Sequence, residues 1–198
     1  APNQKTSMGA EGASVMFDFP RQDIGRMELR PAGKIVAGTI HLDLWNDEVY
    51  TFKFFILQSY RTIVTDYHVP NNHILLNLFY RLYLDITGIR TLSDAFNHPF
   101  LLRLPQLIFA VITLIFTFRA SGILFNKKVA LLSLLLLVTT IPYVNFTPQI
   151  RGYNLSMMLF LLLFYYSLRY FEFGRKTLVP LISIFTALLI YTIPSNMY

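Results

Sequence analysis

The second half of the chain consists of long uncharged apolar runs joined by short polar connections. Four of these runs approach the roughly 18 to 20 residues that a helix needs to cross a bilayer. They cover residues 104–118, 129–150, 155–168 and 177–198. A buried helix of a soluble protein can show one such run, but four in succession exceed what a soluble core can hold. The pattern therefore predicts four transmembrane helices.

Upstream of these runs, between Asp47 and about Leu84, the apolar residues recur at the spacing of a helix. This periodicity predicts two amphipathic helices that lie at the membrane surface. Between them, the stretch TDYHVPNNH contains Pro70 and two adjacent asparagines. Because these residues disfavour helix, the stretch is predicted to form an ordered polar loop.

The first 43 residues show neither pattern. They contain one short strand-like run, Lys34 to Ile40, and nothing long enough to cross a membrane. We therefore expect an irregular N-terminal segment over 1–43, an extracytoplasmic loop with amphipathic helices over 44–100, and a transmembrane helix bundle over 101–198. The predicted fold class is an all-α membrane protein with about four transmembrane helices.

The composition of the chain agrees with this class. Of its 198 residues, 54% are hydrophobic and 14% are charged, against about 25% charged in an ordinary soluble domain. The net charge is +6, but Lys and Arg are scattered singly or in pairs, which argues against nucleic acid as a partner. Cysteine is absent, so disulfides and thiol chemistry are excluded for these residues.

The charges of the connections predict an orientation in the membrane. The connections after the first and third apolar runs are rich in Lys and Arg, whereas the connection between them, NFTPQIRGYN, holds one arginine. Cytoplasmic loops carry an excess of Lys and Arg. We therefore expect residues 1–103 and the segment around Arg151 to be extracytoplasmic.

Polar residues of that predicted outer side are the candidates for chemistry. Asp47 and Glu48 directly precede the first surface helix, and Asp66 and His73 lie in or next to the polar loop. Acidic residues at a helix start also serve as caps, because the helix dipole favours them there. A lone histidine is also commonly structural. The residues alone leave both interpretations open.

Four motifs in order resemble the N-terminal part of the GT-C glycosyltransferases, the polytopic membrane enzymes that include protein O-mannosyltransferases and aminoarabinose transferases. The motifs stand in LWNDEVYTF, PNNHILLNLFYRL, LLRLPQLIFAVITLIF and QIRGYNLSMMLFLLLFYYSLRY. The family features are matched by Trp45 to Thr51, Pro70 to His73, Arg103 to Pro105, and Arg151 to Tyr153. The resemblance covers about residues 42–198.

The resemblance implies transfer of a sugar from a polyprenyl-phosphate carrier to an acceptor on the extracytoplasmic face. It makes Asp47 the expected catalytic carboxylate, which takes the proton of the attacking hydroxyl. Glu48 is the second choice, since neighbours on a helix face different directions. A divalent cation bound through Asp47 and Asp66 is the alternative role for these oxygens, because carboxylates are the ligands that hard cations prefer. No other cofactor is expected.

A lipid phosphate leaves in that reaction, so groups that stabilise its charge are needed. His73, Arg103, Arg151 and Tyr153 are the candidates, since all four are predicted on the outer side. Each also has a simpler explanation. An arginine or tyrosine at the end of a transmembrane helix is commonly an interfacial anchor.

The sequence departs from the family pattern at both ends. Relatives begin with a transmembrane helix before the Asp-Glu pair, whereas the residues before Trp45 include several charges, and relatives continue beyond four transmembrane helices. These departures favour a fragment or a shortened relative. They also keep open an alternative class, a non-catalytic GT-C-derived subunit that packs against membrane-protein partners. In either case membrane lipid is an expected partner.

Overall fold

The computed structural model describes residues 44–66 and 72–193, all within one compact unit that spans residues 34–198. Every regular element in these two ranges is helical. The elements are α1 (Asn46–Thr51), the π-helix η2 (Phe52–Ile56), α2 (Tyr60–Thr65), α3 (Ile74–Thr87), α4 (Leu92–Asn97), α5 (Pro99–Leu124), α6 (Lys127–Thr139), α7 (Ile141–Phe146), α8 (Gly152–Phe173), the 3₁₀ turn η3 (Lys176–Leu178) and α9 (Val179–Thr192).

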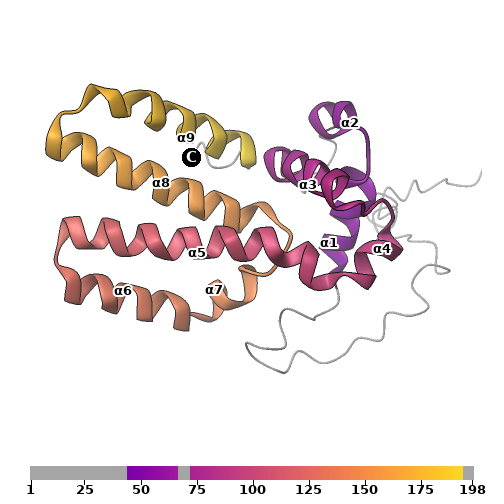
Figure 1. The fold of residues 1–198 in the computed structure, drawn as a ribbon, viewed down its shortest axis with the longest axis horizontal. Coiled ribbons are helices and arrows are strands. Elements are labelled where there is room, and N and C mark those ends of the chain that lie inside the picture. The colour runs from indigo at the N-terminus through magenta and orange to yellow at the C-terminus, as the bar shows by residue number, and fades with distance from the viewer. Residues whose placement is uncertain (1–43, 67–71, 194–198) are drawn as a thin grey trace, which may run out of the picture. The chain divides into compact units, whose positions relative to one another are not determined.

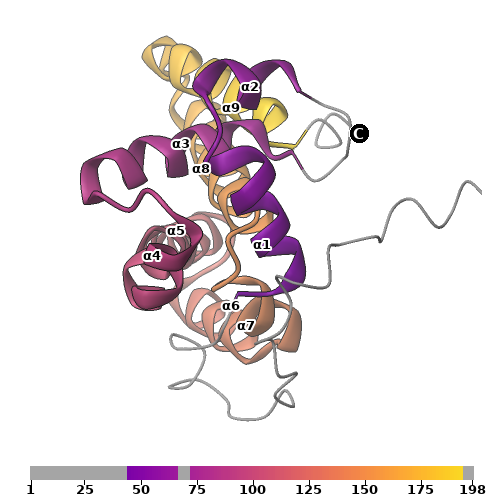
Figure 2. The same ribbon diagram turned by 90° about the vertical axis from the view of Figure 1, so that its right-hand side faces the viewer.

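Four helices lie side by side in the order α6, α5, α8 and α9, and the helices α1 to α4 gather at one end of them (Figures 1 and 2). The all-α class predicted from the sequence is confirmed for the described residues. The predicted irregular segment 1–43, with its strand-like run Lys34 to Ile40, lies outside them.

Local signals in the sequence account for the helix ends. Ser59 caps α2 by accepting a hydrogen bond from the Thr62 backbone N–H, and the Asn126 side chain accepts from two N–H groups at the start of α6. Gly88 and Gly174 follow α3 and α8 with φ of 78° and 63°, the left-handed conformation that ends a helix most easily at glycine.

Only one helix in the described ranges is both long and apolar enough to cross a membrane. This is α5, with 26 residues and a mean hydropathy of 2.1, and only 22% of its most apolar stretch is buried. A core helix of a soluble protein would be mostly buried. Lys176–Thr192 is apolar but shorter. The prediction of four transmembrane helices is therefore not confirmed.

Proline explains why, in two of the four apolar runs, the helix is shorter than the run itself. Residues before proline favour extended backbone, which ends a helix. In the second run, Pro142 is the second residue of α7 and has no N–H with which to continue α6; Thr140 is extended, so the run is divided between α6 and α7. In the last run α9 ends at Thr192 because Ile193, which precedes Pro194, is extended.

A proline inside α5 leaves a backbone carbonyl that helps to attach α3 to the long helices. Pro105 has no N–H, so the Leu101 carbonyl one turn earlier lacks its helical donor. The Tyr83 hydroxyl of α3 donates to that carbonyl at 2.8 Å, and the buried Tyr80 hydroxyl donates to the Leu102 carbonyl at 2.9 Å. The start of α5 is thereby fixed against α3.

Candidate active site

The adjacent acidic residues at the start of α1 lie in different surroundings. The Asp47 side chain is 59% exposed, whereas the Glu48 side chain is fully buried. Each is paired with a different arginine. These two ion pairs, the buried pair Glu48–Arg103 and the rim pair Asp47–Arg151, define the polar end of the helices.

The buried pair joins three parts of the chain. The Glu48 carboxylate accepts hydrogen bonds from the backbone N–H of Ile150 at 2.6 Å and of Trp45 at 2.8 Å. The Arg103 guanidinium lies 3.4 Å from Glu48 and donates to the Pro148 carbonyl. Glu48 thus caps its own helix and fixes the segment that leads into α8. The pair is built as a structural link.

The rim pair is open to solvent on the carboxylate side. Arg151 is the N-cap residue of α8, with extended backbone, and its guanidinium lies 2.5 Å from the Asp47 carboxylate. The same guanidinium lies 5.2 Å from the centre of the Tyr153 ring, a cation–π distance. Asp47, Arg151 and Tyr153 therefore form one continuous polar surface.

His73 lies directly beneath this surface. Its side chain is 3% exposed, and its ring meets the edge of the Tyr153 ring at 5.6 Å between centroids. Within the described residues, neither ring nitrogen has a hydrogen-bond partner. Burial, together with the positive charge of Arg151, lowers the pKa of His73 to about 4. The imidazole is therefore neutral at physiological pH.

The glycine that starts α8 makes room for this histidine. A Cβ atom at Gly152 would lie 2.9 Å from the His73 Cγ atom and 3.0 Å from Nδ1. Any larger residue would displace the imidazole or the end of α8. The close contact is therefore the reason for glycine here, and positive φ is not involved.

Asn72 holds the segment that carries His73. Its side-chain amide donates to the backbone carbonyls of Ile63 and Asp66, at 2.9 and 2.6 Å, and its oxygen accepts from Asn77. Asp66 stands at the C-terminal end of α2. Among the described residues, no group of three or more His, Cys, Asp or Glu side chains is placed to hold a metal ion.

The structure therefore brings six of the sequence-predicted residues into two groups of contacts: Asp47 with Arg151, Tyr153 and His73, and Glu48 with Arg103. Sequence reasoning missed the buried amides Gln106 and Asn154. Asn154 of α8 donates to the Gln106 carbonyl of α5 at 2.7 Å. The available signal was that Gln106 is the one amide in the first apolar run and that Asn154 directly precedes the third run.

Apolar helices with charged groups at their ends are typical of a helical membrane protein. The family model for dolichyl-phosphate-mannose-protein mannosyltransferase matches residues 86–193, more than half of the chain. The chain belongs to this family, which confirms the resemblance to the GT-C glycosyltransferases. No match was found among curated proteins or among solved structures.

The matched range covers only part of the candidate site. It includes Arg103, Arg151 and Tyr153 and all of α5 to α9, but it begins after Asp47, Glu48 and His73. The family match therefore supports a membrane glycosyltransferase at the level of class. Any role of the acidic residues in α1 has to be argued from their contacts in the structure.

Proposed function

We propose that this chain acts as a GT-C glycosyltransferase that moves a sugar from a polyprenyl-phosphate carrier to an acceptor hydroxyl on the extracytoplasmic face, with Asp47 as the catalytic carboxylate. The observation that carries the proposal is the rim pair. Asp47 is an exposed carboxylate, held by an arginine that belongs to the family-matched part of the chain. Glu48 is buried in its own pair, so the catalytic role goes to Asp47.

The proposed step needs one general base. The acceptor oxygen attacks the anomeric carbon of the sugar while the bond from that carbon to the phosphate oxygen breaks. The acceptor proton passes to the Asp47 carboxylate, and the lipid phosphate leaves with the electron pair of the broken bond. A positioned carboxylate typically contributes a factor of about 10² to 10⁴ to such a reaction.

Arg151 is the residue we assign to the leaving phosphate. It stands beside Asp47, at the start of a long helix, and a guanidinium forms strong paired hydrogen bonds with phosphate oxygens. Arg103 is less suited, because it is buried and already holds Glu48 and the Pro148 carbonyl. Tyr153 and the neutral His73 complete the wall of the site.

The same site is a poor match for a divalent cation. Cation sites of the magnesium or calcium type use several oxygen ligands. In the described ranges Asp47 faces a guanidinium instead, and no cluster of three acidic or histidine side chains exists. We therefore assign no step to a metal ion. A test is simple: activity that falls when EDTA is added and returns with magnesium contradicts this assignment.

The decisive variant is Asp47→Asn, assayed with a polyprenyl-phosphate sugar in reconstituted membranes. We expect turnover to fall by about 10² to 10⁴, with an unchanged thermal unfolding curve. Asp85→Asn is the matched control, because Asp85 is also an exposed aspartate, paired with Arg81 at 3.1 Å. Wild-type turnover in Asp47→Asn overturns the assignment. A wild-type chain that is inactive but co-purifies with a fixed membrane partner supports the non-catalytic subunit instead.

A further inference from the structure

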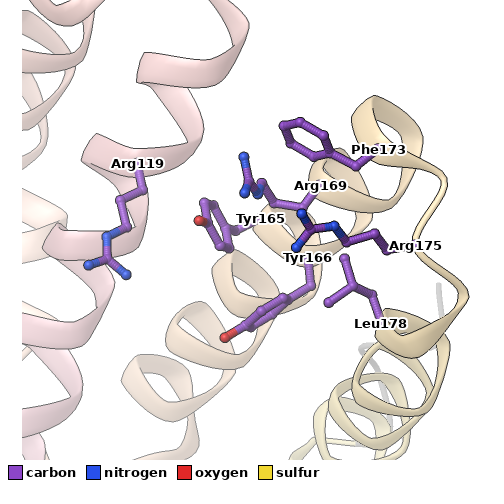
Figure 3. A pocket seen from close by; sticks show the side chains of 7 residues that line it. All are labelled: Arg119, Tyr165, Tyr166, Arg169, Phe173, Arg175 and Leu178. Atoms are coloured by element: carbon purple, nitrogen blue, oxygen red, sulfur yellow. The ribbon is translucent and has the colours of Figure 1, made fainter.

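A second charged site lies at the other end of the long helices. It is a cavity of about 210 Å³ between the end of α5, the end of α8 and the turn that leads to α9. The residues that line it are Arg119, Tyr165, Tyr166, Arg169, Phe173, Arg175 and Leu178 (Figure 3). The side chains come from separate elements, so the chain fold, not one local motif, creates this cavity.

The charge of the cavity is strongly positive. Among the seven described residues that line it, three are arginines and none is acidic. Arg169 and Arg175 lie over the Phe173 ring, at 4.2 and 5.5 Å from its centre. Glu172 lies 3.3 Å from Arg169 and balances one of the three charges. The remaining excess favours an anion.

The separation of the two charged ends corresponds to the thickness of a membrane. Arg103 and Arg119 are 16 residues apart on α5, which is about 24 Å along a helix. Arg151 and Arg169 are 18 residues apart on α8, which is about 27 Å. The hydrocarbon core of a bilayer is about 30 Å thick. When the rim pair lies at one interface, the arginine cavity lies near the edge of the hydrocarbon core on the other side, from which long arginine side chains can reach the lipid phosphates.

We propose that this cavity binds the phosphate of an anionic membrane phospholipid. Guanidinium groups from two helices and a turn donate to the phosphate oxygens, and the hydroxyls of Tyr165 and Tyr166 supply further donors. The lipid is favoured over a soluble phosphate because the helices that carry the cavity expose large apolar side chains along their length, Ile108, Val111 and Ile115 on α5 and Phe160 and Phe164 on α8. These surfaces suit the acyl chains of the same lipid.

The test is a lipid titration followed by native mass spectrometry of the chain in detergent. The probes are dioleoyl phosphatidylglycerol and, for comparison, dioleoyl phosphatidylcholine. We expect one phosphatidylglycerol retained per chain and markedly weaker binding of phosphatidylcholine. Because hydrogen bonds to charged groups are strong, Arg175→Gln and Arg119→Gln should each weaken phosphatidylglycerol binding by about tenfold. Both arginines are exposed, so the variants are expected to fold.

Lys127→Gln with Lys128→Gln is the matched control, because these exposed lysines lie at the start of α6 and do not line the cavity. Equal losses in the lysine and arginine variants overturn the proposal in favour of general surface charge. Displacement of the lipid by millimolar inorganic phosphate also overturns it, since the cavity then selects phosphate from any source. Neither readout involves sugar transfer, so this test is independent of the function proposed for Asp47.

Discussion

The two ion pairs at the head of the long helices start from neighbouring residues and serve different purposes. Glu48 and Arg103 are both buried, and backbone groups complete their hydrogen bonds. Asp47 and Arg151 lie at the rim, with the carboxylate exposed. The same chemical pair is therefore a structural link in one place and an accessible group in the other. Burial decides between the two roles.

The physical reason is the cost of removing charge from water. A buried pair is stable only when further hydrogen bonds replace the lost hydration, and loss of one partner leaves an uncompensated charge. An exposed pair is solvated and contributes about 0 to 1 kcal/mol. A substrate can therefore compete for the rim pair at low cost, but not for the buried one.

The largest expected effect is on the buried pair. Glu48→Ala leaves Arg103 buried without its carboxylate, and we expect the free energy of unfolding to fall by about 3 to 5 kcal/mol. Chemical unfolding in detergent measures it. A double variant, Glu48→Leu with Arg103→Met, should recover part of the loss because both charges are gone. A loss below about 1 kcal/mol for Glu48→Ala contradicts the structural role.

The next largest expected effect is a loss of stability at low pH, caused by the buried His73 beneath the rim pair. The pKa of His73 is lowered from 6.5 to about 4 in the folded chain, so the unfolded chain binds a proton first as pH falls. Stability is thus complete above pH 6.5 and declines from there to about pH 4, by up to about 3 kcal/mol.

Thermal unfolding between pH 4 and 7.5 measures this decline. In His73→Asn the part due to the imidazole should disappear, whereas His98→Asn, at an exposed histidine, should keep it. An unchanged pH profile in His73→Asn shows that His73 is not buried as described.

Gly152→Ala tests the fit beneath the rim pair. The new Cβ would lie 2.9 Å from the His73 ring, and overpacking of this kind costs about 1 to 3 kcal/mol. We also expect lower transfer activity, because the start of α8 carries Arg151. Gly122→Ala in α5 is the control: nothing lies within 4 Å of its added Cβ, so it should be neutral or stabilising.

The smallest expected effect on stability belongs to the rim pair. The Arg151 side chain is 12% exposed, but its partner Asp47 is 59% exposed, so Arg151→Gln leaves a solvated carboxylate. The free energy of unfolding should therefore change by about 1 kcal/mol, while sugar transfer falls because the leaving phosphate loses its guanidinium. Unfolding curves and turnover are measured on the same preparation. A stability loss as large as that of Glu48→Ala removes the distinction between the two pairs.

The sequence predicted several elements well because their signals are local. Helical spacing of apolar residues predicted the helices now seen as α1 with η2 and as α3. The predicted and observed helix ends differ where proline, which is also a local signal, interrupts an apolar run. The second apolar run reads as one transmembrane helix, but it is divided between α6 and α7 before Pro142.

The sequence by itself determined the helical class, the apolar runs and the family, because composition, periodicity and motif order are properties of neighbouring residues. Only the tertiary structure decided which acid pairs with which arginine. The sequence does not distinguish Arg103 from Arg151 as a partner for Asp47 or Glu48. The pairing depends on how α1 packs against α5 and the start of α8. The structure also placed three arginines around one cavity at the far end. Burial and distance between remote residues arise only when the chain folds, and these quantities set the chemistry of a charged group.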